Sequence, residues 1–204
     1  MIRQLAFGCG VLSLLVLAVA TIAGGMAYPG YDHLTQYISE LGATGAPTSA
    51  GVSLAFMISG GLLAGFWLLC AGLFPRSVLS ILGFGLSALN GVGLVLGGVF
   101  RCDFECSTAD LSPAAVLHDV FGGFGYLCGI AGVFAVGIAA RRWPQGRGLF
   151  GLSLMCGIPA VLVIGLIHPA FEWYGGAQRV LEIALAVWTL AVALRVRKTA
   201  WGAA

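Results

Sequence analysis

The sequence has very little charge for its length. Only 9% of its 204 residues are Asp, Glu, Lys or Arg, whereas roughly a quarter of the residues in a soluble domain are charged. Apolar residues make up 59% of the chain, and its mean hydropathy is +1.00. Because so few charges cannot cover a surface that faces water, most of the chain must be solvated by lipid. This composition excludes a soluble enzyme, a nucleic-acid-binding domain and a disordered chain.

Six runs of mainly apolar residues are each long enough to cross a bilayer as a helix, which takes about 20 residues. They are Leu5 to Met26, Val52 to Phe74, Val78 to Phe100, Ala114 to Ala140, Leu149 to Ile167 and Ala177 to Leu194. None shows the apolar and polar alternation of a membrane β-strand. The sequence therefore predicts an all-α polytopic membrane protein, with residues 1–204 forming a single six-helix transmembrane domain.

The first run has one alternative interpretation. Arg3 follows the initiating methionine as a charged start, and Ala18-Val19-Ala20 resembles a cleavage site for signal peptidase. However, the apolar run is longer than the 7–15 residues typical of a signal peptide. A first transmembrane helix is therefore the prediction, and a cleaved signal peptide is the alternative.

Basic residues divide unequally between the two sides of this predicted bundle. One side would carry both termini together with Arg3, Arg76, Arg141, Arg142, Arg147, Arg195, Arg197 and Lys198. The other side would carry only Arg101 and Arg179. Because Lys and Arg concentrate in cytoplasmic loops, we expect both termini to be cytoplasmic and the protein to lie in the cell (inner) membrane.

All acidic residues and all histidines fall on the opposite, outer side. They are Asp32, Glu40, Asp103, Glu105, Asp110, Asp119, Glu172, Glu182, His33, His118 and His168. Chemistry or recognition by ionisable groups is therefore expected at the outer face. Exclusion of acids from a basic cytoplasmic side would explain the residues in loops, but not Asp119 and Glu182, which lie within predicted helices.

The first outer loop contains a helical pattern. Apolar residues recur at i, i+3, i+4 and i+7, at Leu34, Tyr37, Ile38 and Leu41. Asp32 would cap the start of this short amphipathic helix and Gly42 would end it. The helix would either cover the bundle as a lid or point Ser39 and Glu40 into a ligand-binding site.

Another outer loop contains Cys102 and Cys106, four residues apart. Because thiols oxidise outside the cytoplasm, we expect these cysteines to form a local disulfide. A metal site is the alternative, although two cysteines alone do not complete a zinc site.

Small residues mark the helix faces that pack inward, since membrane helices associate through close contact of small side chains. The spacings Gly61-xxx-Gly65, Gly93-xxx-Gly97 and Gly125-xxx-Gly129 are candidates for such contacts. The polar residues on these inward faces are Asn90, His118, His168, Arg179 and Glu182.

An ionisable residue inside a membrane helix marks a candidate functional site. We predict His118, Asp119 and Glu182 as catalytic candidates. Ser39, Glu40, Arg179 and Asn90 are the predicted ligand-binding residues. In the alternative interpretation, Arg179 and Glu182 form an ion pair that only stabilises packing, because they are three residues apart on one helix.

The stretch Tyr31-Asp32-His33-Leu34-Thr35-Gln36-Tyr37-Ile38-Ser39-Glu40-Leu41-Gly42 resembles the hallmark of an uncharacterised multi-pass membrane family, domain-of-unknown-function family 998. Cys102-Asp103 with Cys106, a histidine early in the fourth span, and Gln178-Arg179 are also similar to that family. This resemblance implies an architecture and no activity. The Ile-Ser-Glu-Leu-Gly part is also similar to a motif of autophagy-modulator and GPI-anchor-remodelling membrane proteins, which would imply lipid handling at the outer or lumenal leaflet.

Three classes of function fit these observations. In the first, an outer cavity binds or transports a lipid or a small amphipathic molecule, and Arg179 holds its phosphate or carboxylate. Transport is less consistent with the sequence, because the inner half of the bundle has almost no ionisable residues. In a second class, the protein is structural or accessory, and its outer acids and histidines serve packing and topology.

The third class is an intramembrane enzyme that modifies lipids. His118, His168 and Glu172 would bind a metal such as zinc, and a metal-activated water would hydrolyse an ester or amide. Alternatively, His118 would act as a general base beside a carboxylate. His118 and His168 could also be axial ligands of a haem.

Overall fold

The computed structural model describes residues 1–198 as an all-helical chain, in which no strand occurs. Its elements are α1 (Ile2–Ala27), η1 (Ser39–Gly42), α2 (Ser49–Leu73), α3 (Val78–Val99), η2 (Phe104–Cys106), α4 (Pro113–Ala140), α5 (Arg147–Ile164) and α6 (Tyr174–Lys198). The predicted all-α class is therefore confirmed. Residues 199–204 of the predicted single domain lie outside the described residues.

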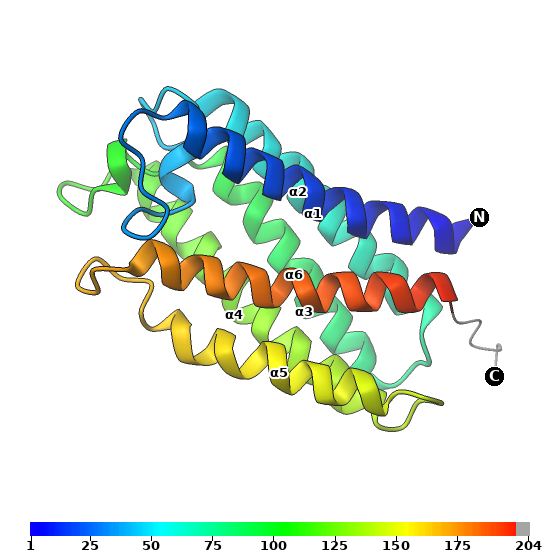
Figure 1. The fold of residues 1–204 in the computed structure, drawn as a ribbon. Helices are drawn as coiled ribbons and strands as arrows, with labels where there is room; N and C mark the ends of the chain where they lie inside the picture. The colour runs from blue at the N-terminus through cyan, green and yellow to red at the C-terminus, as the bar shows by residue number, and fades with distance from the viewer. Residues whose placement is uncertain (199–204) are drawn as a thin grey trace.

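The six α-helices form a closed ring. Each packs against its neighbours in the chain, and α6 also packs against α1, which closes the ring. The helices run side by side along the long axis of the molecule, with both ends of the described chain at the same end of the bundle (Figure 1). This arrangement leaves two bundle ends that differ in their loops and in their charge.

Five helices, α1 to α5, are long and apolar enough to cross a membrane. The chain is therefore a multi-pass helical membrane protein. Helix α6 has 25 residues but does not meet the same criterion of composition. It carries Arg179 and Glu182 near its start and three basic residues in its last turn, yet it fills the place between α1 and α5 in the ring.

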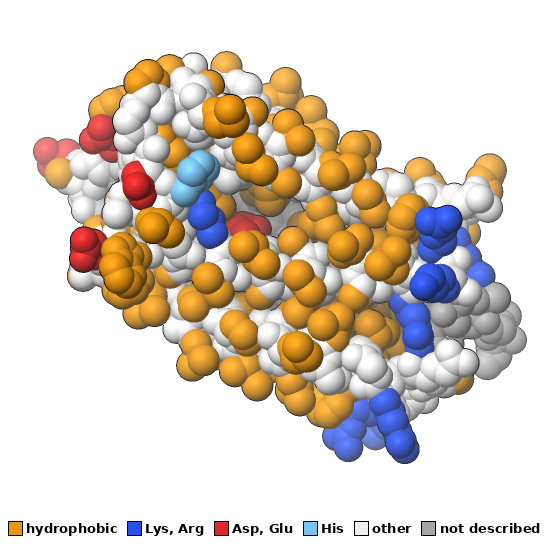
Figure 2. Space-filling view, viewed as in Figure 1, with side chains coloured by type: hydrophobic (Ala, Val, Ile, Leu, Met, Phe, Trp, Pro, Cys, Tyr) orange, Lys and Arg blue, Asp and Glu red, His pale blue; other side chains and the backbone are white. Residues whose placement is uncertain are grey.

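The charged residues separate in space. Figure 2 shows most of the visible Lys and Arg side chains gathered at the end that carries both termini, and most of the visible Asp and Glu side chains at the opposite end. We call these the basic end and the acidic end. The loops after α1, α3 and α5 lie at the acidic end, as the sequence predicts.

Helix α4 starts one residue before the predicted run from Ala114 to Ala140. The hydroxyl of Ser112 accepts a hydrogen bond from the backbone N–H of Ala115 at 3.1 Å, and Pro113 occupies the first helical position. Proline is favoured there because its missing N–H would have no partner within the helix. This start places His118 one and a half turns inside α4, close to the acidic end.

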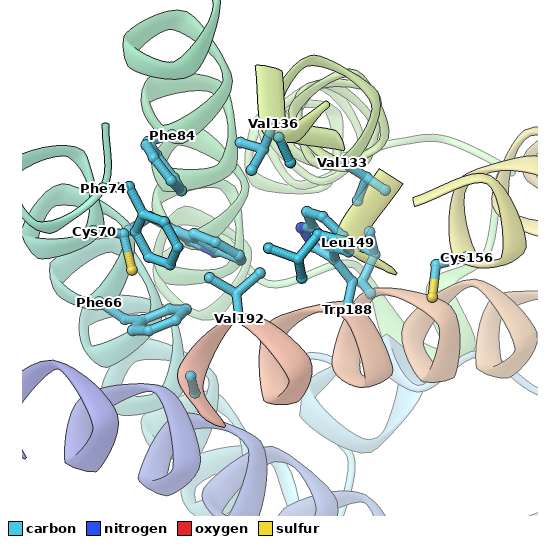
Figure 3. Close-up of a cluster of buried hydrophobic side chains, with 14 of the residues drawn as sticks. Phe66, Cys70, Phe74, Phe84, Val133, Val136, Leu149, Cys156, Trp188 and Val192 are labelled. Carbon is cyan, nitrogen blue, oxygen red and sulfur yellow. The ribbon is translucent and has the colours of Figure 1, made fainter. Parts of the chain in front are cut away.

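The half of the bundle near the basic end is filled by a hydrophobic core. Phe74, which follows α2, lies 5.1 Å from the ring of Trp143 and 5.4 Å from that of Phe84. Trp188 of α6 and Phe66 of α2 belong to the same cluster and are almost completely buried (Figure 3). These large side chains close the interior toward the basic end.

Two of the three predicted glycine spacings, the one starting at Gly93 and the one starting at Gly125, bring α3 and α4 together. A Cβ on Gly93 of α3 would lie 2.8 Å from the Cα of Gly125 in α4, too close for any side chain. By contrast, a Cβ on Gly61 or Gly65 would meet nothing within 4 Å. The prediction of a contact at Gly61 and Gly65 is therefore wrong, because that face of α2 points away from the other helices.

The predicted amphipathic helix over residues 32–42 is also wrong. The chain makes a turn from Asp32 and then only the short 3₁₀ helix η1 (Ser39–Gly42). Ile38 and Leu41 are buried, as predicted, but Leu34 is 58% exposed. Ile38 and Leu41 thus reach the interior without an α-helix between residues 32 and 42.

Hydrogen bonds to other groups explain this conformation. The backbone N–H of Ile38 donates to Oε1 of Gln178 in α6 at 2.7 Å. The N–H of Gly176 donates to the carbonyl oxygen of Leu34 at 2.8 Å. Because partners on α6 take these backbone groups, they are not available for the i to i−4 bonds of a helix.

Candidate functional site

A cavity of about 800 Å³ occupies the half of the bundle near the acidic end. Its walls come from all six α-helices and from the loops after α1, α3 and α5. Ile22 of α1 and Ile183 of α6 line it, although they are 60% and 62% exposed on the outside of the bundle. The cavity therefore opens sideways between α1 and α6, where Figure 2 shows the surface hollowed.

The deeper part of the cavity presents little polarity to a ligand. Its polar side chains are small and bonded to the protein: the hydroxyls of Ser13 and Ser59 each donate to the other's carbonyl oxygen at 2.9 Å. Leu14, Leu63 and Leu185 line the same region. Since buried hydroxyls that are already bonded offer no free donor, this part of the cavity suits an apolar group.

Glu182 lies at the end of a chain of hydrogen bonds across the cavity wall. Nε2 of Gln178 donates to the hydroxyl oxygen of Tyr126 at 3.0 Å, and the Tyr126 hydroxyl donates to Oε1 of Glu182 at 2.7 Å. The other end of the chain is the bond from Ile38 to Gln178. The second oxygen of Glu182, Oε2, has no hydrogen-bond partner among residues 1–198 and is not sealed from the cavity.

Arg179 is held by neutral groups. Its Nη1 donates to the carbonyl oxygens of Gln36 and Gly175, both at 2.9 Å. Its Nη2 donates to the hydroxyl of Tyr31 at 2.6 Å and to Nδ1 of His33 at 2.9 Å. In the part of the chain that the structure describes, no carboxylate is a partner of this guanidinium.

The ion pair that the sequence suggested between Arg179 and Glu182 therefore does not form. The guanidinium binds the loop after α1, whereas the Glu182 carboxylate binds Tyr126. The two side chains carry opposite charges on one wall of the same cavity and have separate partners.

His33 and Tyr31, which both accept hydrogen bonds from Arg179, have the protonation states that these bonds require. Burial and the nearby guanidinium lower the pKa of His33, which keeps its Nδ1 available as an acceptor. Burial raises the pKa of Tyr31 to about 12, so its hydroxyl stays protonated and donates to the carbonyl oxygen of Tyr37 at 2.7 Å. Arg179 thus fastens the loop after α1 to the start of α6.

His118 has one ring nitrogen bound to backbone. Its Nδ1 lies 3.0 Å from the carbonyl oxygen of Gly97 and 2.8 Å from that of Phe100, at the end of α3. Because carbonyl oxygens only accept, Nδ1 carries the proton and donates. In the neutral ring, Nε2 then keeps its lone pair, and His118 is part of the cavity wall.

A model of one protein family, described as a protein of unknown function (DUF998), matches residues 11–195. The chain belongs to the DUF998 family. The matched residues run from α1 to α6 and include every polar side chain of the cavity described above. Comparison with curated proteins and with solved structures finds no match. This match confirms the resemblance predicted from the sequence. The description of the family assigns no activity.

Most predicted site residues come together in this DUF998 protein. Those that line the cavity are Ser39, Asn90, His118, Asp119, His168, Arg179 and Glu182. They come from three α-helices (α3, α4 and α6) and from the loops after α1 and α5, so the ring of helices brings them to one place. Asn90 donates from Nδ2 to the carbonyl oxygen of Gly125 at 3.2 Å.

Glu40, a predicted ligand-binding residue, is buried within the loop after α1 and does not line the cavity. It is only 2% exposed, and its carboxylate accepts hydrogen bonds from the N–H of Tyr37 at 2.8 Å and from Nε2 of Gln36 at 2.7 Å. Burial raises the pKa of this carboxyl group above its ordinary value. Glu40 thus positions the loop.

The predicted metal ligands of this DUF998 chain do not come together. Across residues 1–198, no group of three or more His, Cys, Asp or Glu side chains is placed to hold a metal ion. Glu172 is exposed and lies outside the cavity lining. Nδ1 of His168 accepts a hydrogen bond from the N–H of Ala170 at 3.1 Å, which occupies the lone pair of that nitrogen.

The predicted disulfide between Cys102 and Cys106 is confirmed, with an S–S distance of 2.06 Å. It holds the loop after α3 against the loop after α1. The hydroxyl of Ser39 lies 3.4 Å from Sγ of Cys106, and the N–H of Thr44 donates to the carbonyl oxygen of Cys102 at 2.9 Å. The disulfide therefore stabilises the wall of the DUF998 cavity at the acidic end.

Sequence reasoning missed Tyr126, Gln178 and His33 as site residues. Tyr126 lies eight residues after His118 in the same helix, so helical spacing could have placed it on the same inward face. The resemblance to DUF998 included Gln178 without a role. No local pattern indicates that His33 contacts Arg179, because this contact depends on how α1 and α6 pack.

Proposed function

We propose that this DUF998 protein binds a lipid or a small amphipathic molecule in the cavity near its acidic end. One observation carries the proposal: the cavity combines a deep apolar part, a polar part at the acidic end and an opening between α1 and α6. Its volume is within the range of about 300–1,000 Å³ that is usual for small-molecule sites. The apolar chain of a ligand would fill the deep part, and its polar group would meet Arg179, His118 and Glu182.

The proposal includes the orientation in the membrane. Helix α6 is the sixth span, since it has the length of the others and completes the ring. The basic end faces the cytoplasm with both termini, in keeping with the concentration of Lys and Arg there. The cavity then lies in the outer leaflet of the inner membrane, and a ligand enters through the opening between α1 and α6 without leaving the lipid.

Binding is favoured over transport by the hydrophobic core. Phe74, Phe84 and Trp143 pack together on the cytoplasmic side of the cavity in this orientation. A polar group crossing the bundle would have to displace these rings, and the core cluster around them contains no charged side chain among the described residues. The site is therefore accessible from one leaflet only.

Photolabelling tests the proposal. The full-length protein would be placed in phosphatidylcholine vesicles containing a trace of lysophosphatidylethanolamine with a diazirine in its acyl chain. Ala186→Trp fills the cavity from α6, whereas Val187→Trp adds the same volume at a position that is 45% exposed outside it. We expect saturable labelling of the wild type and of Val187→Trp, and its loss in Ala186→Trp. Equal labelling of all three proteins would overturn the proposal.

A lipid-modifying hydrolase is a second candidate, favoured by the geometry of His118. A histidine whose Nδ1–H is held by carbonyl oxygens, with a free Nε2 at a cavity wall, is arranged as a general base. Incubation with the same lysolipid and mass spectrometry of the products would test this. Release of fatty acid by the wild type and not by His118→Ala would establish hydrolysis. An unchanged lysolipid would exclude that activity on this substrate.

A further inference from the structure

The charges that line the cavity are unbalanced. Asp119 and Glu182 contribute two carboxylates, and Arg179 contributes one guanidinium. The three histidines of the lining are His33, His118 and His168. His33 and His168 each accept a hydrogen bond at Nδ1, which requires that nitrogen to be unprotonated. The lining therefore has two acidic side chains and only one arginine.

Arg179 is poorly placed to bind an anion. All four of its Nη–H groups donate to protein acceptors, which are Gln36, Gly175, Tyr31 and His33. A phosphate or carboxylate would have to replace some of these bonds and release the loop after α1. Anion binding by Arg179 was the expectation from the sequence, and the geometry disfavours it.

Glu182 is placed to bind a cation. The hydroxyl oxygen of Tyr126 accepts from Gln178, so the single hydroxyl proton of Tyr126 is directed to Oε1 of Glu182. This leaves Oε2 as an acceptor without a donor among the described residues, at the wall of a cavity that opens toward lipid. A charged group inside a membrane is costly unless it is paired, and residues 1–198 supply no cation to this oxygen.

We propose that the polar group of the ligand is a protonated amine, held by Glu182 and attracted by Asp119. An ammonium supplies a positive charge to pair with the second acidic side chain, and an N–H from which Oε2 of Glu182 can accept a hydrogen bond. Asp119, on α4, is exposed and has no hydrogen-bond partner among residues 1–198, so it adds charge near the acidic end. This inference rests on the proposed binding function and specifies its ligand class.

Matched single-chain probes test the charge preference. Full-length protein in detergent would be titrated with n-dodecylammonium, dodecanoate and dodecanol, and the bound fraction would be read by native mass spectrometry. We expect n-dodecylammonium to bind about tenfold or more tightly than dodecanoate, the effect of one charge-assisted hydrogen bond. Equal binding of all three probes, or a preference for dodecanoate, would overturn the proposal that the ligand carries an amine. It would leave the proposed binding function intact. If no probe binds, the proposed function itself fails.

Three variants test which acidic residues cause the preference for n-dodecylammonium. Glu182→Gln keeps an acceptor for Tyr126 but removes the charge, so it should abolish the preference for the ammonium while dodecanol binds as before. Asp119→Asn, on an exposed residue without hydrogen bonds to lose, should weaken the preference several-fold and covers the case in which Glu182→Gln does not fold. Glu172→Gln, an exposed acid outside the cavity, should leave it unchanged. A preference that survives in both cavity variants contradicts the assignment.

Two lipid probes identify the source of the amine. Lysophosphatidylethanolamine and lysophosphatidylcholine with the same acyl chain differ in whether the headgroup has N–H donors. Tighter binding of lysophosphatidylethanolamine would identify an aminolipid as the ligand. Tight binding of n-dodecylammonium with equal, weak binding of both lysolipids would identify a free lipophilic amine, because the phosphate would be repelled by the two carboxylates.

Discussion

Ile38 and Gln178 are joined by a hydrogen bond of 2.7 Å, although they lie 140 residues apart in the chain. The bond runs from the backbone of the loop after α1 to the side chain of α6. Because Nε2 of the same amide donates to Tyr126, one glutamine connects the loop, α4 and α6 at the cavity wall. The position of Glu182 depends on this connection.

Replacing Gln178 by Leu should therefore destabilise the protein. The change removes the acceptor of Ile38 and the donor to Tyr126, and each buried group left without a partner costs about 1–3 kcal/mol. Thermal unfolding in detergent would measure the loss, with Gln4→Leu, an exposed residue of α1, as the matched control. Equal melting temperatures for both variants would show that the amide contributes nothing.

Asp32 should make the loop after α1 sensitive to acid. Its Oδ1 accepts from the N–H of Leu34 at 2.7 Å and of Thr35 at 3.0 Å, and these bonds lower the pKa of the carboxyl group. A lowered pKa means that this stabilisation is complete above the ordinary value, near pH 3.9, and is lost as the pH falls through the lowered value.

Asp32→Asn separates charge from hydrogen bonding, because the amide oxygen can accept from the same two N–H groups. We expect the variant to melt near the wild-type temperature at pH 6. Between pH 4 and pH 3, the wild type should lose stability that the variant keeps. Parallel melting curves for the two proteins across this range would contradict the role of Asp32.

The disulfide should stabilise the loops at the acidic end. Closing a short loop of this kind contributes about 2 kcal/mol in the chain-entropy model. Replacing Cys102 and Cys106 by Ser should lower the melting temperature under oxidising conditions and remove the effect of an added reductant. In intact cells, neither cysteine should react with a membrane-impermeant thiol reagent before reduction, and labelling without reduction would contradict the bond.

Gly93 and Gly61 should respond in opposite directions to the same change. Gly93→Ala places a methyl group against the backbone of α4 and should cost about 1–3 kcal/mol, as overpacking does. Gly61→Ala meets nothing within 4 Å and should be neutral or stabilise by up to about 1 kcal/mol, since alanine favours helix. Melting temperatures of the two variants in one detergent would test the packing, and equal shifts would refute it.

Much of the architecture could be predicted from local patterns. The length of the apolar runs predicts five of the helices within a few residues, because a bilayer imposes a minimum length on any span. The caps at Ser112 and Pro113 predict the start of α4, and the four-residue spacing of Cys102 and Cys106 predicts their bond. These features depend on neighbouring residues alone.

The loop after α1 shows where such patterns are insufficient. Leu34, Ile38 and Leu41 have the spacing of a helix, yet their segment bonds elsewhere. Side chains of α6 and of the loop, and one backbone N–H of α6, take the backbone groups that a helix would need. Similarly, Arg179 and Glu182 have the spacing of an ion pair, yet the first binds the loop and the second binds Tyr126. Partners from distant segments decided both cases.

The sequence by itself determined that this protein spans a membrane with its acids and histidines gathered at one end. Hydropathy and charge act on each segment separately, so no tertiary contact is needed to read them. Only the tertiary structure decided that the ring of helices leaves a cavity at that end, open between α1 and α6. It also decided that Glu182 faces the cavity with one oxygen that has no donor among the described residues, because Tyr126 donates to the other oxygen and Arg179 donates to the loop after α1 and to α6.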